Sequence, residues 1–287
     1  MIINTDHKIK IGYKTTSEFL GTEIGGLSAR AIITASELGA DCSFRCYLGK
    51  NENSKNTLKF LSKYGIDARA VEIVDHVEPI LSISVVDKNK DDRTVFYDTS
   101  KWHYNIKNEF KNLENLKNAE AIIIDDYINI KTLYKIFEIS SRFKIPIVAD
   151  FENLELQKSK CLFNMVQHLI ISKKFAQNFS GVADVKKIIN DLWNDKKCLV
   201  GITDGENGCY YRSLDSNEIQ HQAAYIQNTK NTLGCGDVFH GAYAFSLFKY
   251  EDFSSRIKFA SAAASLKASG KKVNIRNIDK LLKIFEN

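Results

Sequence analysis

The chain has 287 residues, of which 44% are hydrophobic and 26% charged, and its formal net charge is +5. These values are ordinary for a soluble globular protein, and the length suffices for one large α/β domain. The lysines are spread along the chain, and no basic block alternates with aromatic residues, which argues against a nucleic-acid partner. No apolar run approaches membrane-spanning length, and the N-terminus lacks a signal-peptide core, so no membrane partner is expected.

The six cysteines are scattered, and several lie in apolar, strand-like runs. Such usage indicates reduced, buried thiols and therefore a cytoplasmic protein. Cys42 and Cys46 have no accompanying histidine pair or second cysteine pair, so the sequence predicts no zinc site and no residues that bind a metal directly.

The first hundred residues combine short strands with two helices. Gly25-Gly26 begins the first helix, and Gly39 ends it. Strands are expected at Lys8–Ile11, Ser17–Thr22, Cys42–Leu48, Ala70–Val74, Ile80–Val86 and Thr94–Tyr97, and helices at Leu27–Leu38 and Ser54–Tyr64. Because no helix separates the last three strands, we expect them to pair antiparallel, in a β-sheet lid formed from about 6–24 and 70–100.

From about residue 112 apolar strands alternate with helices, a pattern typical of a doubly wound, mostly parallel α/β sheet. Strands are expected at Ala121–Ile124, Ile147–Ala149, Leu169–Ile171, Cys198–Thr203, Cys209–Arg212 and His221–Ile226, and helices at Ile130–Phe143, Lys173–Phe179, Asp184–Trp193, Ser254–Ala268 and Ile278–Phe285. The whole chain, 1–287, is thus predicted to be a single domain carrying the lid.

Ligands of such sheets bind beyond the carboxyl ends of the strands. Polar residues stand there in this sequence: Asp125, Asp150, Ser172 and Thr203. Asp125 and Asp126 either contact a ligand or are solvated carboxylates at a strand end.

The stretch from Asn231 to Phe245 holds the strongest signal of function. Gly234-Cys235-Gly236-Asp237 is a glycine-rich turn that begins an apolar helix. Such a turn has unpaired N–H groups and the positive end of the helix dipole, so it favours a phosphate. Asp237 would repel that anion unless it accepts a proton from the attacking hydroxyl, and the other interpretation is a plain N-cap.

The sequence contains neither a P-loop nor a dinucleotide fingerprint nor the motifs of protein kinases. Instead, Asn231-Thr-Leu-Gly-Cys-Gly-Asp-Val-Phe-His-Gly-Ala resembles the Asp-Thr-x-Gly-Ala-Gly-Asp-x-Phe motif of the ribokinase-like (PfkB) carbohydrate kinases. Gly25-Gly26 followed by Leu38-Gly39 is similar to the N-terminal motif of that family. Ile171-Ser-Lys-Lys-Phe-Ala176 is closest in form to ketohexokinase-like members.

This resemblance implies a sugar kinase that transfers the γ-phosphoryl group of ATP, with Mg²⁺, to a sugar hydroxyl. Asp237 matches the general base, and Gly234, Cys235 and Gly236 match the anion hole. The remaining matches are Asp6, Gly25 and Gly26 for the sugar, Thr203, Gly205 and Ser261 for the nucleotide, and Asn231 for a loop that binds a monovalent cation. The resemblance also implies a homodimer formed through the lid.

The sequence departs from the family pattern at several positions. Arg30 and Asn231 replace an asparagine and an aspartate, Phe175 replaces a glutamate, and the first strand is reduced to Met1–Asn4. Arg30 would face the sugar and favour an acidic substrate, or face solvent. The alternatives to a sugar kinase are a nucleoside kinase of the same fold and a sugar-binding relative with weak catalysis.

Overall fold

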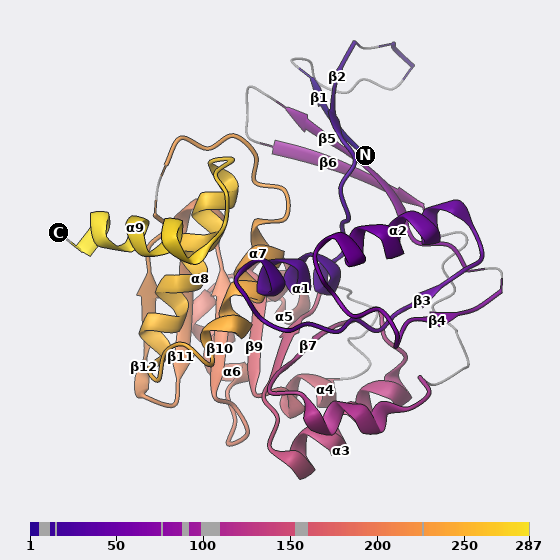
Figure 1. The fold of residues 1–287 in the computed structure, drawn as a ribbon. Coiled ribbons are helices and arrows are strands. Elements are labelled where there is room, and N and C mark those ends of the chain that lie inside the picture. The colour runs from indigo at the N-terminus through magenta and orange to yellow at the C-terminus, as the bar shows by residue number, and fades with distance from the viewer. Residues whose placement is uncertain are drawn as a thin grey trace.

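The computed structural model describes residues 1–5, 12–14, 16–75, 77–87, 92–98, 110–152, 160–225 and 227–286. A six-stranded sheet lies between two layers of helices, and a separate four-stranded sheet lies beyond α1 and α2 (Figure 1). None of the helices in the described part of the chain combines the length and the apolarity needed to cross a membrane.

The central sheet has the order β12-β11-β10-β9-β8-β7. Its strands are β7 (Ile122–Asp125), β8 (Ile147–Asp150), β9 (His168–Ser172), β10 (Leu199–Thr203), β11 (Cys209–Ser213) and β12 (Ser216–Gln222). The four strands from β7 to β10 are parallel, whereas β11 and β12 continue the sheet antiparallel. The expected doubly wound, mostly parallel α/β fold is therefore confirmed, although β12 begins and ends earlier than the predicted strand.

Alternate residues of each parallel strand face opposite layers, because side chains alternate along a strand. In β8, Ile147 and Ala149 belong to the apolar core under the first layer, and Val148 belongs to the core under the second. The first layer contains α3 (Ile130–Phe143), α4 (Lys160–Met165), α5 (Lys173–Ser180) and α6 (Val185–Leu192), and the second contains α1 (Leu27–Glu37), α7 (Cys235–Ser246), α8 (Phe253–Ala268) and α9 (Ile275–Glu286).

Polar side chains fix where several of these helices begin. An oxygen of each capping side chain accepts a hydrogen bond from a backbone N–H of the first turn, which stabilises a helix by about 1 kcal/mol. The caps are Asn51 of α2 (Glu52–Lys63), Asn129 of α3, Ser172 of α5, Asp184 of α6 and Asp252 of α8. Ser172 thus ends β9 and begins α5 at the same residue.

The four-stranded sheet has the order β2-β1-β5-β6, and its strands are β1 (Ile2–Thr5), β2 (Glu18–Gly21), β5 (Leu81–Asp87) and β6 (Asp92–Asp98). The antiparallel pairing of β5 with β6 is as expected. The N-terminal strand is not lost from the fold, because β1 lies inside this sheet and pairs with both β2 and β5. We call these four strands the lid sheet. The predicted strand Lys8–Ile11 lies outside the described residues.

Two predicted strands differ from the structure. Of Cys42–Leu48, only β3 (Tyr47–Leu48) and a single bridge at Ser43 are strand-like. β4 (Glu72–Ile73) pairs in parallel with β3 and takes no part in the lid sheet. Two 3-10 helices complete the described elements, η1 (Leu113–Asn118) and η3 (Gly205–Asn207).

Helices α1 and α7 cross at unusually short range. A Cβ atom at Gly241 of α7 would lie 2.1 Å from the carbonyl oxygen of Ala31 and 2.9 Å from Cβ of Thr34. Only glycine leaves room for this approach, since interiors are close-packed. The crossing holds the beginning of α1 beside the beginning of α7 (Figure 1).

Candidate active site

The carboxyl ends of the parallel strands meet at one edge of the central sheet. Asp125 of β7 lies opposite Asp150 of β8, and Ser172 of β9 lies opposite Thr203 of β10. The four polar strand ends that the sequence indicated therefore lie at this edge as two aligned pairs, and the register of β8 with β9 offsets one pair from the other by two residues. It is the edge at which open α/β sheets bind ligands.

The glycine-rich turn before α7 leaves two backbone amides unpaired. Gly234 is the N-cap residue, with φ 76°, a conformation that glycine adopts without strain. The Val238 N–H donates to the Gly234 carbonyl at 3.0 Å, and the Cys235 N–H donates to the Thr232 carbonyl at 3.2 Å. No described residue accepts a hydrogen bond from the N–H of Gly236 or of Asp237. Two adjacent free amides at a helix N-terminus are suited to bind an anion.

Space for that anion exists at Gly236. The residue is exposed, and a Cβ atom built there would meet no described atom within 4 Å. Its backbone angle lies outside the left-handed region, unlike that of Gly234. The turn is therefore open toward solvent at the position where the unpaired amides lie.

The carboxylate of Asp237 does not cap α7. Among the described residues no side chain makes a cap hydrogen bond to this helix. Although Asp237 retains some contact with solvent, burial raises the pKa of its carboxyl to about 8. Asp150 and Glu152 raise the pKa further, whereas His240 and Arg30 lower it. A carboxylate with a pKa near neutrality is suited to accept a proton.

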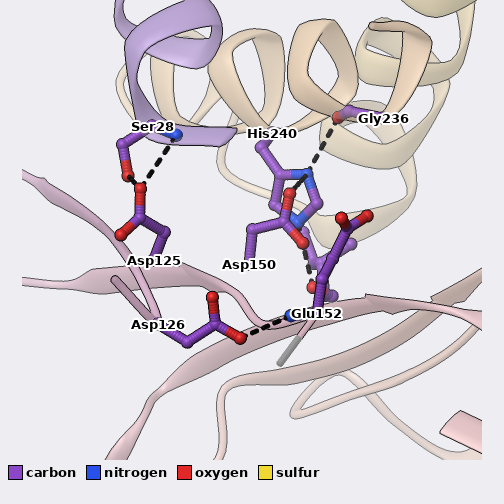
Figure 2. A network of polar contacts seen from close by, with 8 residues as sticks. Ser28, Asp125, Asp126, Asp150, Glu152, Gly236 and His240 are labelled. Atoms are coloured by element: carbon purple, nitrogen blue, oxygen red, sulfur yellow. Dashed lines mark hydrogen bonds and ion pairs between the residues drawn. The ribbon is translucent and has the colours of Figure 1, made fainter. Parts of the chain in front are cut away.

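Two more carboxylates are held by hydrogen bonds at this edge (Figure 2). Asp125 accepts from the backbone N–H and the hydroxyl of Ser28, at 3.3 and 2.7 Å, and so joins the edge to α1. Buried Asp126 accepts from the Glu152 N–H at 2.7 Å. The interpretation of both as solvated strand-end carboxylates is therefore wrong.

A buried histidine, which the sequence did not indicate, lies beneath the turn. Nδ1 of His240 lies 2.8 Å from the carbonyl oxygen of Gly236 and 3.2 Å from Oδ2 of Asp150, and Nε2 lies 2.9 Å from the carbonyl oxygen of Ile170 (Figure 2). The only signal in the sequence was its position, one helical turn after Asp237, because its partners come from distant strands.

Arg30 lies against the same turn. A Cβ atom at Gly234 would lie 3.9 Å from Cγ and 4.0 Å from Nε of Arg30, and 3.6 Å from Oδ2 of Asp237. The Arg30 side chain is 17% exposed, and Nη1 pairs with Glu23 at 3.3 Å. Lys267 of α8 reaches the same Glu23 oxygen at 3.7 Å. Arg30 was predicted to face either the sugar or solvent, and its low exposure makes the prediction of solvent the weaker one.

The other predicted sugar contacts lie around the beginning of α1. Gly25 and Gly26 are exposed there, and Gly26 is the N-cap residue, with φ 99°. Asp6 lies outside the described residues.

The predicted nucleotide residues lie on other elements. Thr203 ends β10, and Gly205 follows it with φ 55° in η3, where Asp204 pairs with Lys173 at 2.7 Å. Ser261 is buried on α8, and its hydroxyl has no hydrogen-bond partner among the described residues.

Two departures from the family pattern have structural counterparts. The side-chain oxygen of Asn231 accepts from the Leu233 N–H at 2.8 Å and so shapes the loop before the turn. Phe175 is buried and packs against both Phe163 and Phe179, as a core residue does. In the described ranges no three histidine, cysteine, aspartate or glutamate side chains form a group able to hold a metal ion.

Comparison with known proteins was made over the whole chain. Residues 15–280 match the model of the pfkB family carbohydrate kinases. A curated relative, ribokinase from Bacillus subtilis, is 23% identical over 276 residues, which cover 93% of this chain and 88% of the relative. The solved structure of Arabidopsis thaliana ribokinase complexed with ribose and ATP has a TM-score of 0.79 and 16% identity, covering 98% of this chain and 95% of that one. An E. coli structure in complex with ATP and Mg²⁺ has a TM-score of 0.78 and 16% identity, covering 99% and 96%.

Proposed function

Since the chain belongs to the pfkB family of carbohydrate kinases and is a kinase, we propose that it transfers the γ-phosphoryl group of ATP to a hydroxyl group of a sugar, with Asp237 as the general base. The proposal rests on one observation. The two backbone amides without a described hydrogen-bond acceptor, at Gly236 and Asp237, lie on the same turn as a carboxylate of raised pKa. An anion site beside a proton acceptor is what phosphoryl transfer to an alcohol requires.

In the proposed reaction the sugar oxygen forms a bond to the γ-phosphorus while the bond from that phosphorus to the bridging oxygen breaks. ADP leaves with the electron pair of the broken bond, and Asp237 takes the proton of the hydroxyl. The amides of Gly236 and Asp237 stabilise the charge on the transferred group, supported by the dipole of α7. The Cys235 amide already has a partner, so its contribution is to shape the turn together with Gly234.

The residues present fit ATP with Mg²⁺. The open space at Gly236 admits a phosphate, and α7 provides the dipole. Magnesium usually keeps several waters and binds mainly to the phosphates of the nucleotide, which agrees with the lack of a three-ligand group in the described ranges. When bound, the ion neutralises charge on the β- and γ-phosphates.

We assign the nucleotide side of the site to Thr203 and Gly205 at the end of β10, and the border of the adenine to Ser261, whose unpartnered hydroxyl supports the assignment. We place a monovalent cation at the loop of Asn231. The neutral amide of Asn231 is engaged in its own turn, so such an ion would be bound more weakly than by a carboxylate.

The experiment that tests the function measures ATP consumption with a panel of neutral sugars, sugar acids and nucleosides, in potassium and in sodium buffers. The proposal requires formation of a phosphorylated sugar together with ADP. Turnover with nucleosides alone would replace it by the nucleoside kinase. Sugar binding without ATP consumption would replace it by the binding protein.

The substrate class that we propose is a sugar bearing an acidic group, bound at Gly25 and Gly26 and recognised by Arg30. The guanidinium of Arg30 lies beside the turn. Arg30 and Lys267 both pair with half-exposed Glu23, so the two cations attract a carboxylate at this place, and a carboxylate of the substrate would be attracted there as well. Arginine suits carboxylate because its donors match both oxygens. Asp6, which the family pattern adds to the sugar contacts, is part of the same proposal.

We expect Arg30→Ala to raise the KM for gluconate about 10- to 100-fold, because a hydrogen bond to a charged group contributes roughly 1.5–3 kcal/mol. The KM for ribose should change little. Steady-state kinetics with both sugars measures the difference.

Glu23→Gln is the matched control, since it leaves Arg30 in place and removes the competing carboxylate. It should lower the KM for gluconate. Equal changes for gluconate and ribose in Arg30→Ala would rule out the acidic substrate without touching the kinase assignment.

We also propose a homodimer formed through the lid sheet. One face of this sheet carries large apolar side chains that are exposed in the single chain: Phe19, Leu81, Ile83 and Phe96. A second copy would cover such a patch, which monomers seldom expose. A cytoplasmic location is part of the proposal, since none of the five cysteines whose side chains the structure describes forms a disulfide. Light scattering at several protein concentrations tests the dimer.

A further inference from the structure

The buried contacts of His240 go beyond what the proposed chemistry uses. The side chain is 3% exposed and lies one turn after Asp237 on α7. Three oxygen atoms surround its ring, from the Gly236 carbonyl, the Asp150 carboxylate and the Ile170 carbonyl (Figure 2). These atoms come from α7, β8 and β9, so the ring joins the helix to two strands of the sheet.

The partners fix the hydrogens on the ring. A carbonyl oxygen can only accept a hydrogen bond, so Nε2 donates to Ile170 and Nδ1 donates to Gly236. A ring with hydrogens on both nitrogens is an imidazolium ion. The carboxyl group of Asp150 lies beside it, with Oδ2 at 3.2 Å from Nδ1, and burial together with the neighbouring acidic groups raises the pKa of that carboxyl well above its ordinary value.

The hydrogen bond to Gly236 acts directly on the anion site. The carbonyl of Gly236 and the N–H of Asp237 belong to one planar peptide and point in opposite directions. A donor fixed at the carbonyl therefore helps to hold the Asp237 N–H pointing out of the N-terminal end of α7. This N–H is one of the two unpaired amides of the turn.

The charge of the ring acts on the carboxylate of Asp237. Acidic groups outnumber basic ones around it, and every element packed on this part of α7 contributes. The charged and titratable groups are Arg30 of α1, Asp125 and Asp126 of β7, Asp150 and Glu152 at the end of β8, His168 of β9, Arg256 and Lys267 of α8, and Asp237 itself. Burial lowers the pKa of His168 to about 3, so this histidine is neutral near pH 7.

We propose that His240 is a positioning residue for phosphoryl transfer, which orients the Gly236–Asp237 peptide and supplies a buried positive charge that favours the ionised form of the base. The inference rests on the proposed role of Asp237. It assigns two effects to His240, one on the orientation of the Asp237 N–H and one on the ionisation of the Asp237 carboxylate. Different experiments distinguish the two effects.

The test compares the pH dependence of kcat/KM for wild type and His240→Asn. Asparagine donates a hydrogen bond but carries no charge. The acid limb should move to higher pH by about 1 to 3 units, the size of shift that a close opposite charge causes. The kcat/KM values of the wild type and of His240→Asn should approach one another at high pH. A loss of the same size at every pH, with the limb unmoved, would overturn the electrostatic part.

Asp150→Asn provides a test of opposite sign. Asp150 raises the pKa of Asp237, so its neutralisation should move the acid limb to lower pH. The matched control is His168→Asn, which removes another buried histidine bonded to α7, through the Tyr243 hydroxyl at 2.9 Å. Its acid limb should stay with that of the wild type.

Two further measurements keep the inference testable if a variant fails to fold or if no sugar is phosphorylated. The double variant His240→Ala/Asp150→Asn removes the donor to the Gly236 carbonyl together with both ionisable groups of the contact, and it should lose kcat with little shift of the limb. A wild-type kcat in this variant would overturn the role in orientation. Carboxyl ¹³C NMR of Asp237 follows its titration without turnover, and an unshifted midpoint in His240→Asn would overturn the charge effect even in a protein that is no kinase.

Discussion

Asp237→Asn is expected to lose turnover by about 10²–10⁴-fold, the range typical for removal of a general base. ATP should still bind, since the amides of Gly236 and Asp237 are backbone groups that the substitution leaves in place. Steady-state kinetics and titration with a non-hydrolysable ATP analogue measure the two effects. Wild-type turnover in this variant would show that the carboxylate accepts no proton.

The same substitution should raise thermal stability, and the pH dependence of that gain follows from the pKa. In the folded protein burial raises the pKa of Asp237 from its ordinary value of 3.8 to about 8. Below about pH 4 the group is protonated in both folded and unfolded states, so it costs nothing. As the pH rises from about 4 to about 8, the carboxyl group ionises in the unfolded state but stays protonated in the folded protein, so the folded state loses stability. This loss is complete above about pH 8. Asp237→Asn should therefore raise Tm by a few degrees at pH 8 to 9 and hardly at pH 4.

Asp252→Ala is the matched control at the neighbouring helix. Asp252 caps α8 by accepting from the Ser255 N–H at 2.7 Å, and Asp237 makes no such bond to α7. The control should lower stability by about 1 kcal/mol and leave turnover unchanged. Opposite signs of the change in Tm at pH 8 would distinguish the buried base from an ordinary cap.

Gly236→Val is expected to lose turnover by about 10²-fold or more while the fold remains stable. A side chain at Gly236 would project into the open space beside the unpaired amides, where it would displace the phosphate. Displacement by about 1 Å is enough for a loss of this size. Turnover at saturating ATP and Tm, measured on the same preparation, separate the two effects.

The expected loss at Gly236 comes from the space that a side chain would occupy. Unusual backbone angles do not contribute, because the left-handed residue of the turn is Gly234, with φ 76°, and not Gly236. Gly236→Ala should consequently lose less activity than Gly236→Val and should fold as well. An active valine variant would show that no phosphate approaches this residue.

Local sequence patterns predicted the parts of the fold that depend on short-range signals. Buried strands ending in Asp125, Asp150, Ser172 and Thr203 identified the edge of the sheet, where Asp125 aligns with Asp150 and Ser172 aligns with Thr203. The turn at Gly234 was visible because glycine spacing and a following apolar helix are both local. Helix ends were within a few residues, since capping residues and terminal glycines mark them.

Pairings between distant segments could not be predicted in this way. The strand β1 is four residues long, too short for a periodic pattern, and its partners β2 and β5 decide its place in the lid sheet. His240 has the same difficulty, because its contacts come from Asp150 and Ile170, far back in the sequence. Neither residue type nor helical spacing distinguishes it from a histidine packed in the core.

The close crossing of α1 and α7 at Gly241 has a consequence for how specificity evolves. Sliding of one helix past the other would bring a clash at the Ala31 carbonyl, so a movement of the lid sheet would have to bend its connection to α1. In the proposed reaction, the packing of α1 on α7 would then hold the acceptor hydroxyl at a fixed distance from the donor phosphate. Substitutions at the beginning of α1 could then exchange one substrate for another without resetting the reaction distance, and position 241 is expected to remain glycine among homologues, because the nearest atom is a backbone oxygen that every residue at position 31 carries.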